Sequence, residues 1–187
     1  MSRLFWHCSS IKALDLTSFN TFNVTNMSKI FANCYSLKYL YLSSLNTINV
    51  TNMKDMFSKC SSIQFLDLSS FNTSKVIYMN GMFEYCSSLE LLDVSSFDTI
   101  NVTDMQLMFA NCYYLKSLDL SSFHTNKVKN MQVMFAGNIS LESLDLSSFN
   151  VTKGTNTFGM FQRCFSLKNI KSKDKIILNL IKNINNF

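Results

Sequence analysis

Residues 66–91 read LDLSSFNTSKVIYMNGMFEYCSSLEL, and nearly all of the remaining chain repeats this unit of 26 residues. The frame begins six times, at Leu14, Leu40, Leu66, Leu92, Leu118 and Leu144. Residues 1–13 fit the second half of an earlier copy. A fixed period of this length is typical of a solenoid, in which each coil stacks on the next. The sequence therefore predicts a repeat solenoid over residues 1–169, followed by a C-terminal cap or tail over residues 170–187.

The first part of each unit has the pattern of a β-strand. Leu92 and Val94 alternate with Asp93, and a period of two places the apolar side chains on one face and the aspartate on the other. One such strand in each coil, repeated in register, predicts a parallel sheet that runs along the solenoid. Its inner face forms the core, and its outer face is an open surface.

The second part of each unit has a helical period. Val102, Met105, Met108, Phe109 and Cys112 are apolar at positions i, i+3, i+6, i+7 and i+10, which favours a helix of about two turns. The predicted fold class is thus an α/β repeat solenoid. It has one parallel strand plus one short helix in each 26-residue coil.

Equivalent positions of the units carry nearly the same residue, so the apolar residues form columns. All eleven methionines fall in two columns, and a third column is phenylalanine at residues 5, 31, 57, 83, 109, 135 and 161. A single coil cannot bury these faces alone, so stability must come from stacking between neighbours. Proline is absent and glycine occurs four times, so we expect Asn, Ser, Thr and Asp to make the turns by bonding their own backbone.

The cysteines also form one column. All six fall in it: Cys8, Cys34, Cys60, Cys86, Cys112 and Cys164. Adjacent coils bring these residues within disulfide reach, but every thiol is expected to point the same way into the core. A ladder of free, buried thiols is the simpler interpretation. A C-x-x-C motif is absent from the sequence, and we expect neither a metal nor a cofactor.

The outer face of the predicted sheet is the candidate protein-binding face. An aspartate column and the serine two residues later project from it. The candidate residues are Asp15, Tyr41, Asp67, Asp93, Asp119 and Asp145, with Ser69, Ser95, Ser121 and Ser147. One interpretation is an acidic strip that binds a protein or a cation. The other is a solvated face that only keeps the sheet soluble.

Other functional classes have little support. His7 and His124, the two histidines, lie in different columns, and the chain has neither a nucleophile-elbow motif nor a phosphate-binding glycine loop, so we expect no enzyme. The net charge is +5, but residues 168–187 carry five lysines against one aspartate, which leaves the array nearly neutral and does not favour nucleic acid. Apolar runs are too short for a membrane span.

The C-terminal segment has an amphipathic pattern. Apolar residues share one helical face: Ile176, Ile177, Leu180, Ile181 and Ile184. We expect a helix that caps the last coil. A helix lying on a membrane surface is the alternative, because lysines are nearby.

The repeat resembles that of the BspA-type leucine-rich-repeat surface proteins, which also occurs in mycoplasma surface lipoproteins and in arrays of protists. The resemblance rests on L-D-L-S-S-F-N-T-x-x-V-T-N-M-x-x-M-F-x-x-C-S-S-L and covers residues 1–170. It implies a leucine-rich-repeat solenoid at the cell surface or outside the cell. The implied role is non-catalytic adhesion, with host or neighbouring-cell surface or matrix proteins as ligands.

Two hypotheses follow for function. The first is an adhesion or protein-binding module that uses the open sheet face. The second is a structural or degenerate fragment of a longer array, with no ligand of its own. The start MSRLFWHC has no apolar stretch of signal-peptide length, so we expect either a truncated array or a gene that begins within a repeat.

Overall fold

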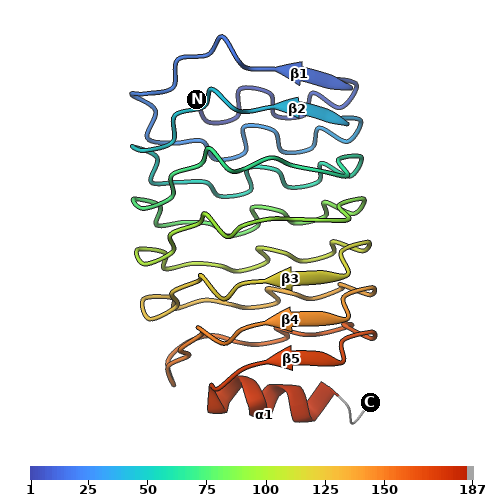
Figure 1. Ribbon diagram of the computed structural model, residues 1–187. Coiled ribbons are helices and arrows are strands. Elements are labelled where there is room, and N and C mark those ends of the chain that lie inside the picture. The colour runs from blue at the N-terminus through green and yellow to red at the C-terminus, as the bar shows by residue number, and fades with distance from the viewer. Residues whose placement is uncertain (185–187) are drawn as a thin grey trace.

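The coils stack into one elongated solenoid, with α1 lying against the last coil (Figure 1). The computed structural model describes residues 1–184, and the side chains of residues 1–182. The elements are β1 (Ala13–Asp15), β2 (Tyr39–Tyr41), β3 (Ser117–Asp119), β4 (Ser143–Asp145), β5 (Asn169–Lys171) and α1 (Lys175–Ile184). All strand pairs are parallel, and Leu14 pairs with Leu40 as Leu118 pairs with Leu144. The predicted solenoid with a parallel sheet is confirmed.

The sheet consists of two parts with two unpaired coils between them. β1 pairs with β2, and β3, β4 and β5 form the second part. Residues 65–67 and 91–93 follow the same path without being strands (Figure 1). A second ladder of parallel bridges is continuous across all of these coils. It joins Asn26, Asn52, Tyr78, Asp104, Asn130 and Asn156 in succession. This second ladder holds the middle coils in the stack where the strand pairing is interrupted.

The prediction of a short helix in each coil is wrong, because that segment forms consecutive turns. The N–H groups of Met105 and Phe109 donate to carbonyls of the following coil, at Asn130 and Met134. The intervening Met108 N–H donates to the Met105 carbonyl, which closes a turn. In a helix every N–H would bond within its own segment. Here the next coil lies in register and accepts alternate N–H groups, and the turns bury the same apolar spacing that a helix would.

These turns require left-handed backbone at two positions in each coil. Fourteen residues have φ between 49° and 77°, as the third residue of a type II turn does. They are Arg3, Lys29, Asp55, Gly81, Leu107, Val133 and Gly159 in one column, and His7, Asn33, Lys59, Tyr85, Asn111, Gly137 and Arg163 in the other. Three of the four glycines of the chain therefore occupy positions that favour glycine.

The core is a set of continuous side-chain stacks. The phenylalanine column runs from Phe5 to Phe161, with ring centroids 5.5–5.9 Å apart and neighbouring rings inclined by 2–13°. The methionines of the central coils, such as Met79 and Met82, are completely buried beside it. Each side chain thus packs against its own copy above and below, as predicted, and aromatic contacts add to the burial of apolar area.

The buried thiols have hydrogen-bond partners. Each donates its S–H to a backbone carbonyl 29 residues earlier, as Cys86 does to Phe57 at 3.2 Å. Asn138 replaces cysteine in one coil and is completely buried. Its side-chain amide donates to the carbonyls of Phe109 and Phe135, and its oxygen accepts from the Cys112 N–H. Because all of its polar atoms have partners, this amide is accommodated in the core.

Polar side chains make the corners of the coil, as predicted. Asn26 and Asn52 each accept the N–H of the residue two positions later, at 2.9 Å. A column of buried threonines links the coils at another corner, where the Thr73 hydroxyl donates to the carbonyl of Asp98. The local bonds of the asparagines let the chain turn without proline, and the threonine bonds join neighbouring coils.

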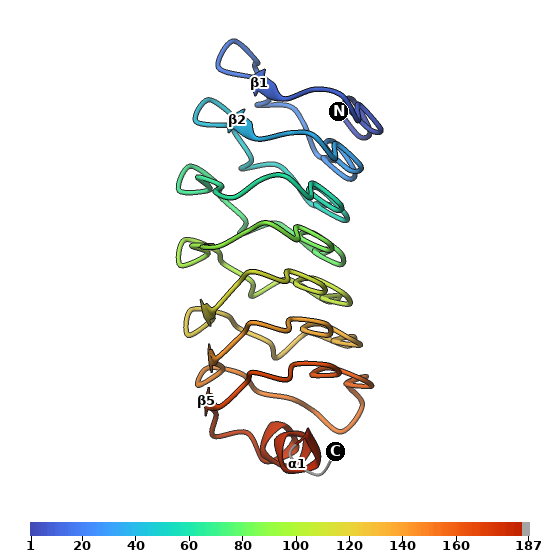
Figure 2. The same ribbon diagram turned by 90° about the vertical axis from the view of Figure 1, so that its right-hand side faces the viewer.

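The C-terminal helix α1 packs against the last coil (Figure 2). Asp174 accepts the N–H groups of Ile176 and Ile177 and so caps the helix start. Its other oxygen accepts the N–H of Val151 in the last coil, and Ile177 is fully buried. The side chain of Ile184, which we placed on the same apolar face, lies outside the described residues. Within residues 1–184, no helix is both long and apolar enough to cross a bilayer.

Candidate functional site

The predicted aspartate and serine columns lie on the outer face of the sheet. Asp15 and Tyr41 end β1 and β2 in matching register, and Asp119 and Asp145 do the same in β3 and β4. Asp67 and Asp93 occupy the equivalent positions of the middle coils. The aspartates and the serines two residues later are exposed, except that Asp145 is half-buried.

Each aspartate of this column makes a local turn. One carboxylate oxygen accepts the N–H two residues later at 2.8–3.0 Å, which closes the end of the strand. The Ser69 hydroxyl and N–H hold the pKa of Asp67 below its usual value, and the Ser95 N–H does the same to the pKa of Asp93. Part of the column's role is therefore structural. The bond also fixes where each carboxylate presents its charge.

An apolar group lies beside this column, and of its residues only Tyr41 was predicted from the sequence as part of the binding face. Tyr39, Tyr41, Phe65 and Leu91 are 61%, 55%, 64% and 57% exposed, and we call them the outer apolar cluster. In β1 and β2, Tyr39 lies beside Ala13, and the 26-residue offset continues that column through Phe65 and Leu91. Beyond Leu91 the same column carries Ser117, Ser143 and Asn169. Reading this column along the repeats would have revealed the cluster.

Carboxylates flank the cluster on both sides. Glu90 precedes Leu91 and accepts a hydrogen bond from the side-chain amide of Gln64 at 3.3 Å. Asp67 and Asp93 follow on the other side of Phe65 and Leu91. All three acidic residues are exposed. The two middle coils thus present an apolar centre between two polar rims, of which the aspartate rim is acidic and the Glu90 rim continues into Lys38 and Lys116 of the neighbouring coils.

The sheet is hollowed next to the cluster. A cavity of about 440 Å³ lies between the strand segments of two successive coils, and Leu91, Asp93, Ser117 and Ser122 are among its lining residues. The buried Ser122 hydroxyl has no hydrogen-bond partner among the described residues. In a paired coil, the equivalent Ser148 hydroxyl donates to the Leu120 carbonyl at 3.0 Å. The cavity therefore lies where the pairing of the strands is interrupted.

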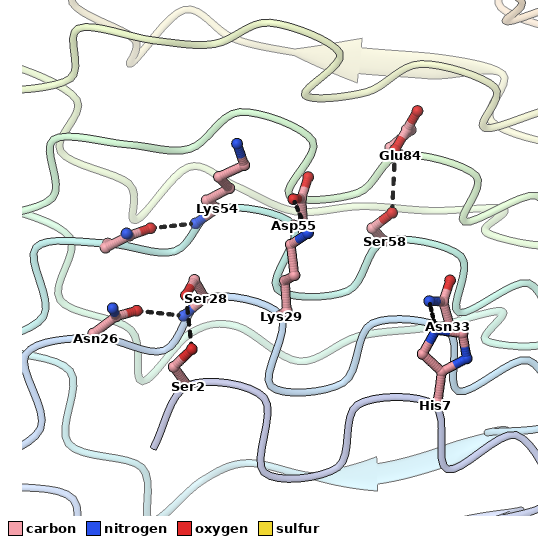
Figure 3. A network of polar contacts seen from close by, with 11 residues as sticks. Ser2, His7, Asn26, Ser28, Lys29, Asn33, Lys54, Asp55, Ser58 and Glu84 are labelled. Atoms are coloured by element: carbon pink, nitrogen blue, oxygen red, sulfur yellow. Dashed lines mark hydrogen bonds and ion pairs between the residues drawn. The ribbon is translucent and has the colours of Figure 1, made fainter.

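A second set of polar side chains lies on the turns of the first coils (Figure 3). Lys29 pairs with Asp55 at 3.5 Å, and the Ser58 hydroxyl donates to Glu84 at 3.2 Å. Burial raises the pKa of Glu84. These contacts link one coil to the next. Within the part of the chain that the structure describes, no group of three or more His, Cys, Asp or Glu side chains is arranged to hold a metal ion.

The stacked coils and their single parallel strands define a leucine-rich-repeat type of solenoid. Residues 1–92 and 86–185 match the family described as "Mycoplasma protein of unknown function, DUF285". These matches span nearly the whole chain, and the protein belongs to this family. A comparison with curated proteins finds no match.

Three solved structures are similar to the chain. The T. pallidum leucine-rich-repeat protein TpLRR is 19% identical with a TM-score of 0.54, over 98% of this chain and 74% of that one. A leucine-rich cell surface protein from Faecalibacterium prausnitzii is 16% identical with a TM-score of 0.35, over 95% and 64% of the two chains. A leucine-rich-repeat protein from Bacteroides ovatus is 16% identical with a TM-score of 0.39, over 93% and 58%. The T. pallidum match establishes the fold and carries no information on the ligand.

Proposed function

We propose that this protein is a non-catalytic adhesion module of the BspA type, displayed at the cell surface, which binds a protein through the outer face of its sheet. The ligand in this proposal is a surface or matrix protein of a host or neighbouring cell. The outer apolar cluster is the observation that carries the proposal.

Exposed apolar groups of this kind distinguish binding surfaces from ordinary surface. Single exposed apolar residues are common, but a contiguous patch with a polar rim marks an interaction site. Two tyrosines and a phenylalanine contribute to the cluster, and aromatic residues are enriched among those that dominate binding energy. The aspartate and serine columns supply the polar rim. The proposal retains the binding face that the sequence predicted and places its centre at Tyr39, Phe65 and Leu91.

Adhesion of protein-coated beads tests the proposal. Wild-type beads are applied to cultured animal epithelial cells and to immobilised fibronectin and collagen. In the variant Tyr39→Ser/Phe65→Ser/Leu91→Ser, we expect adhesion to fall at least about tenfold, because the apolar centre of the interface is removed.

The matched control is Phe158→Ser/Phe165→Ser. These side chains are 74% and 80% exposed but lie in turns outside the cluster. We expect this variant to adhere like the wild type. Equal losses in both variants would show nonspecific apolar adhesion and contradict the proposal. Wild-type beads that adhere no better than albumin-coated beads would favour an array without a ligand of its own.

A further inference from the structure

We propose that the partner of the outer apolar cluster is a protein segment that presents an apolar side chain with a basic side chain beside it. This inference rests on the proposed function and specifies the chemistry of its ligand. Arginine is the basic residue that fits best.

The apolar side chain of the proposed partner is inferred from the position of the cluster. The 26-residue offset places Tyr39, Phe65 and Leu91 in one row across three successive coils. Tyr41 lies two residues after Tyr39 on the same face of β2 and widens the row. One aliphatic or aromatic side chain of a partner covers two such residues. Burying it against this row removes apolar area of both molecules from water.

The basic side chain of the proposed partner is inferred from the charges of the two rims. Glu90 lies on one side of the row, and Asp67 and Asp93 lie on the other. The neighbouring coils place Lys38 and Lys116 in the column of Glu90, which offsets that carboxylate. In the column of Asp67 and Asp93 the neighbouring residues are Tyr41 and Asp119, so no cation in that column offsets the two aspartates. A basic side chain beside the partner's apolar residue meets the charges of Asp67 and Asp93. The planar guanidinium of arginine also stacks on the faces of tyrosine and phenylalanine.

Hydrogen bonds hold the rims in place before a partner arrives. Asp67 accepts from the N–H and the hydroxyl of Ser69, and Asp93 accepts from the N–H of Ser95. Gln64 donates to Glu90. Side chains that are already ordered lose less conformational entropy on binding, so their charges contribute more to affinity.

The same face lacks this arrangement further along the solenoid. In β3 and β4, Ser117 and Ser143 occupy the column of the apolar row. Asp145 there pairs with Lys171 at 3.1 Å. Carboxylates continue on this part of the face without an apolar centre, so it provides a control within one molecule.

Synthetic peptides test the inference. Fluorescent 11-residue peptides carry a central leucine with arginine, glutamine or glutamate two positions before and after it, so that the three side chains share one face of an extended chain. Binding is measured by fluorescence anisotropy at low and high salt. We expect the arginine peptide to bind at least about tenfold more tightly than the glutamate peptide, with the difference shrinking in high salt.

Two variants with the same change of charge make the test specific. Asp67→Asn/Glu90→Gln/Asp93→Asn removes the rims, and asparagine keeps the acceptor of each turn. We expect it to reduce the preference for arginine to below about threefold. Asp119→Asn/Glu142→Gln/Asp145→Asn removes three carboxylates beside Ser117 and Ser143, and we expect it to leave the preference unchanged.

Three results would overturn the inference: no peptide binds, the glutamine or glutamate peptide binds as tightly as the arginine peptide, or both charge variants behave alike. These failures are distinct from failure of the proposed function. If the Tyr39/Phe65/Leu91 variant loses bead adhesion while the peptides show no preference for arginine, then the cluster binds a protein of different chemistry.

Discussion

The inner and outer columns of this solenoid differ in how far they repeat. Along the core, phenylalanine occupies the same column in seven successive coils, from residue 5 to residue 161. On the outer face, the column that starts at residue 13 reads Ala, Tyr, Phe, Leu, Ser, Ser and Asn. A core residue packs against its own copy on both sides, so one change disturbs two contacts. An outer residue faces water and is free to vary. The fold is thus encoded by the columns that repeat, and the proposed binding site lies in a column that does not.

The largest expected difference between buried and exposed positions appears at alkaline pH. Burial raises the pKa of the Cys34 thiol to about 11 and the pKa of the Cys112 and Cys164 thiols to about 12. It also raises the pKa of the thiols of Cys60 and Cys86. A thiol in the unfolded chain ionises near pH 8.5, so the contribution of the buried, protonated thiols to stability is fully present below that pH. Above that pH, each buried thiol lowers the free energy of unfolding by about 1.4 kcal/mol per pH unit, until the pH reaches the pKa of that thiol in the folded protein.

We therefore expect the protein to unfold between about pH 9 and pH 11, because five thiols act together. Urea unfolding followed by circular dichroism at a series of pH values measures this. The variant Cys112→Val should show a shallower loss of stability with pH, since one titrating group is gone. A urea midpoint that stays constant from pH 8 to pH 10.5 would count against buried, protonated thiols.

The next effect contrasts two phenylalanines. Phe83 is completely buried, between Phe57 and Phe109 with both ring centroids 5.7 Å away, whereas Phe65 is 64% exposed. We expect Phe83→Ala to lower the free energy of unfolding by about 3–5 kcal/mol and Phe65→Ala to change it by less than about 0.5 kcal/mol. Urea denaturation of both variants measures the difference. Similar losses in the two would show that the outer row also supports the fold.

The smallest contrast is between two glycines. Gly81 has a φ of 65°, and a Cβ atom there would collide with the carboxylate of Asp55. Gly154 is exposed, with no atom within 4 Å of such a Cβ. We expect Gly81→Ala to destabilise the protein by at least about 1–2 kcal/mol, and Gly154→Ala to be neutral or stabilising by up to about 1 kcal/mol. Thermal unfolding compares them, and a stable Gly81→Ala would refute the left-handed turn at this position.

The core and the strand register could be predicted from the sequence because each repeats. The buried side chains of the unit from Leu66, including Met79, Phe83 and Cys86, are those that the repeated columns indicated. The turn segment was mispredicted for a physical reason. Apolar residues spaced at i, i+3 and i+7 suit a helix and a series of turns equally. The available signal was that Gly81, Gly137 and Gly159 fall in only two columns.

The candidate site was predicted only in part. The outward position of the aspartates followed from the strand alternation, but their bonds to the backbone two residues later depend on the turn that ends the strand. The outer apolar cluster was missed because Tyr39 and Leu91 vary among coils and so stand outside the repeat. A method that averages over the repeats removes the differences between coils, and the outer apolar cluster consists of such differences.

The uniform stack has a consequence for inheritance. The repeated links between coils, such as the thiol bonds and the phenylalanine stacking, each join residues at a constant offset. Deleting or duplicating one whole unit of 26 residues therefore reconnects these repeated links with equivalent partners, whereas a deletion of another length breaks the repeated links that span it. Unequal recombination between copies of the unit thus preserves the packing of the core but changes which residues lie together on the surface. It brings outer residues from distant coils into contact in a single step.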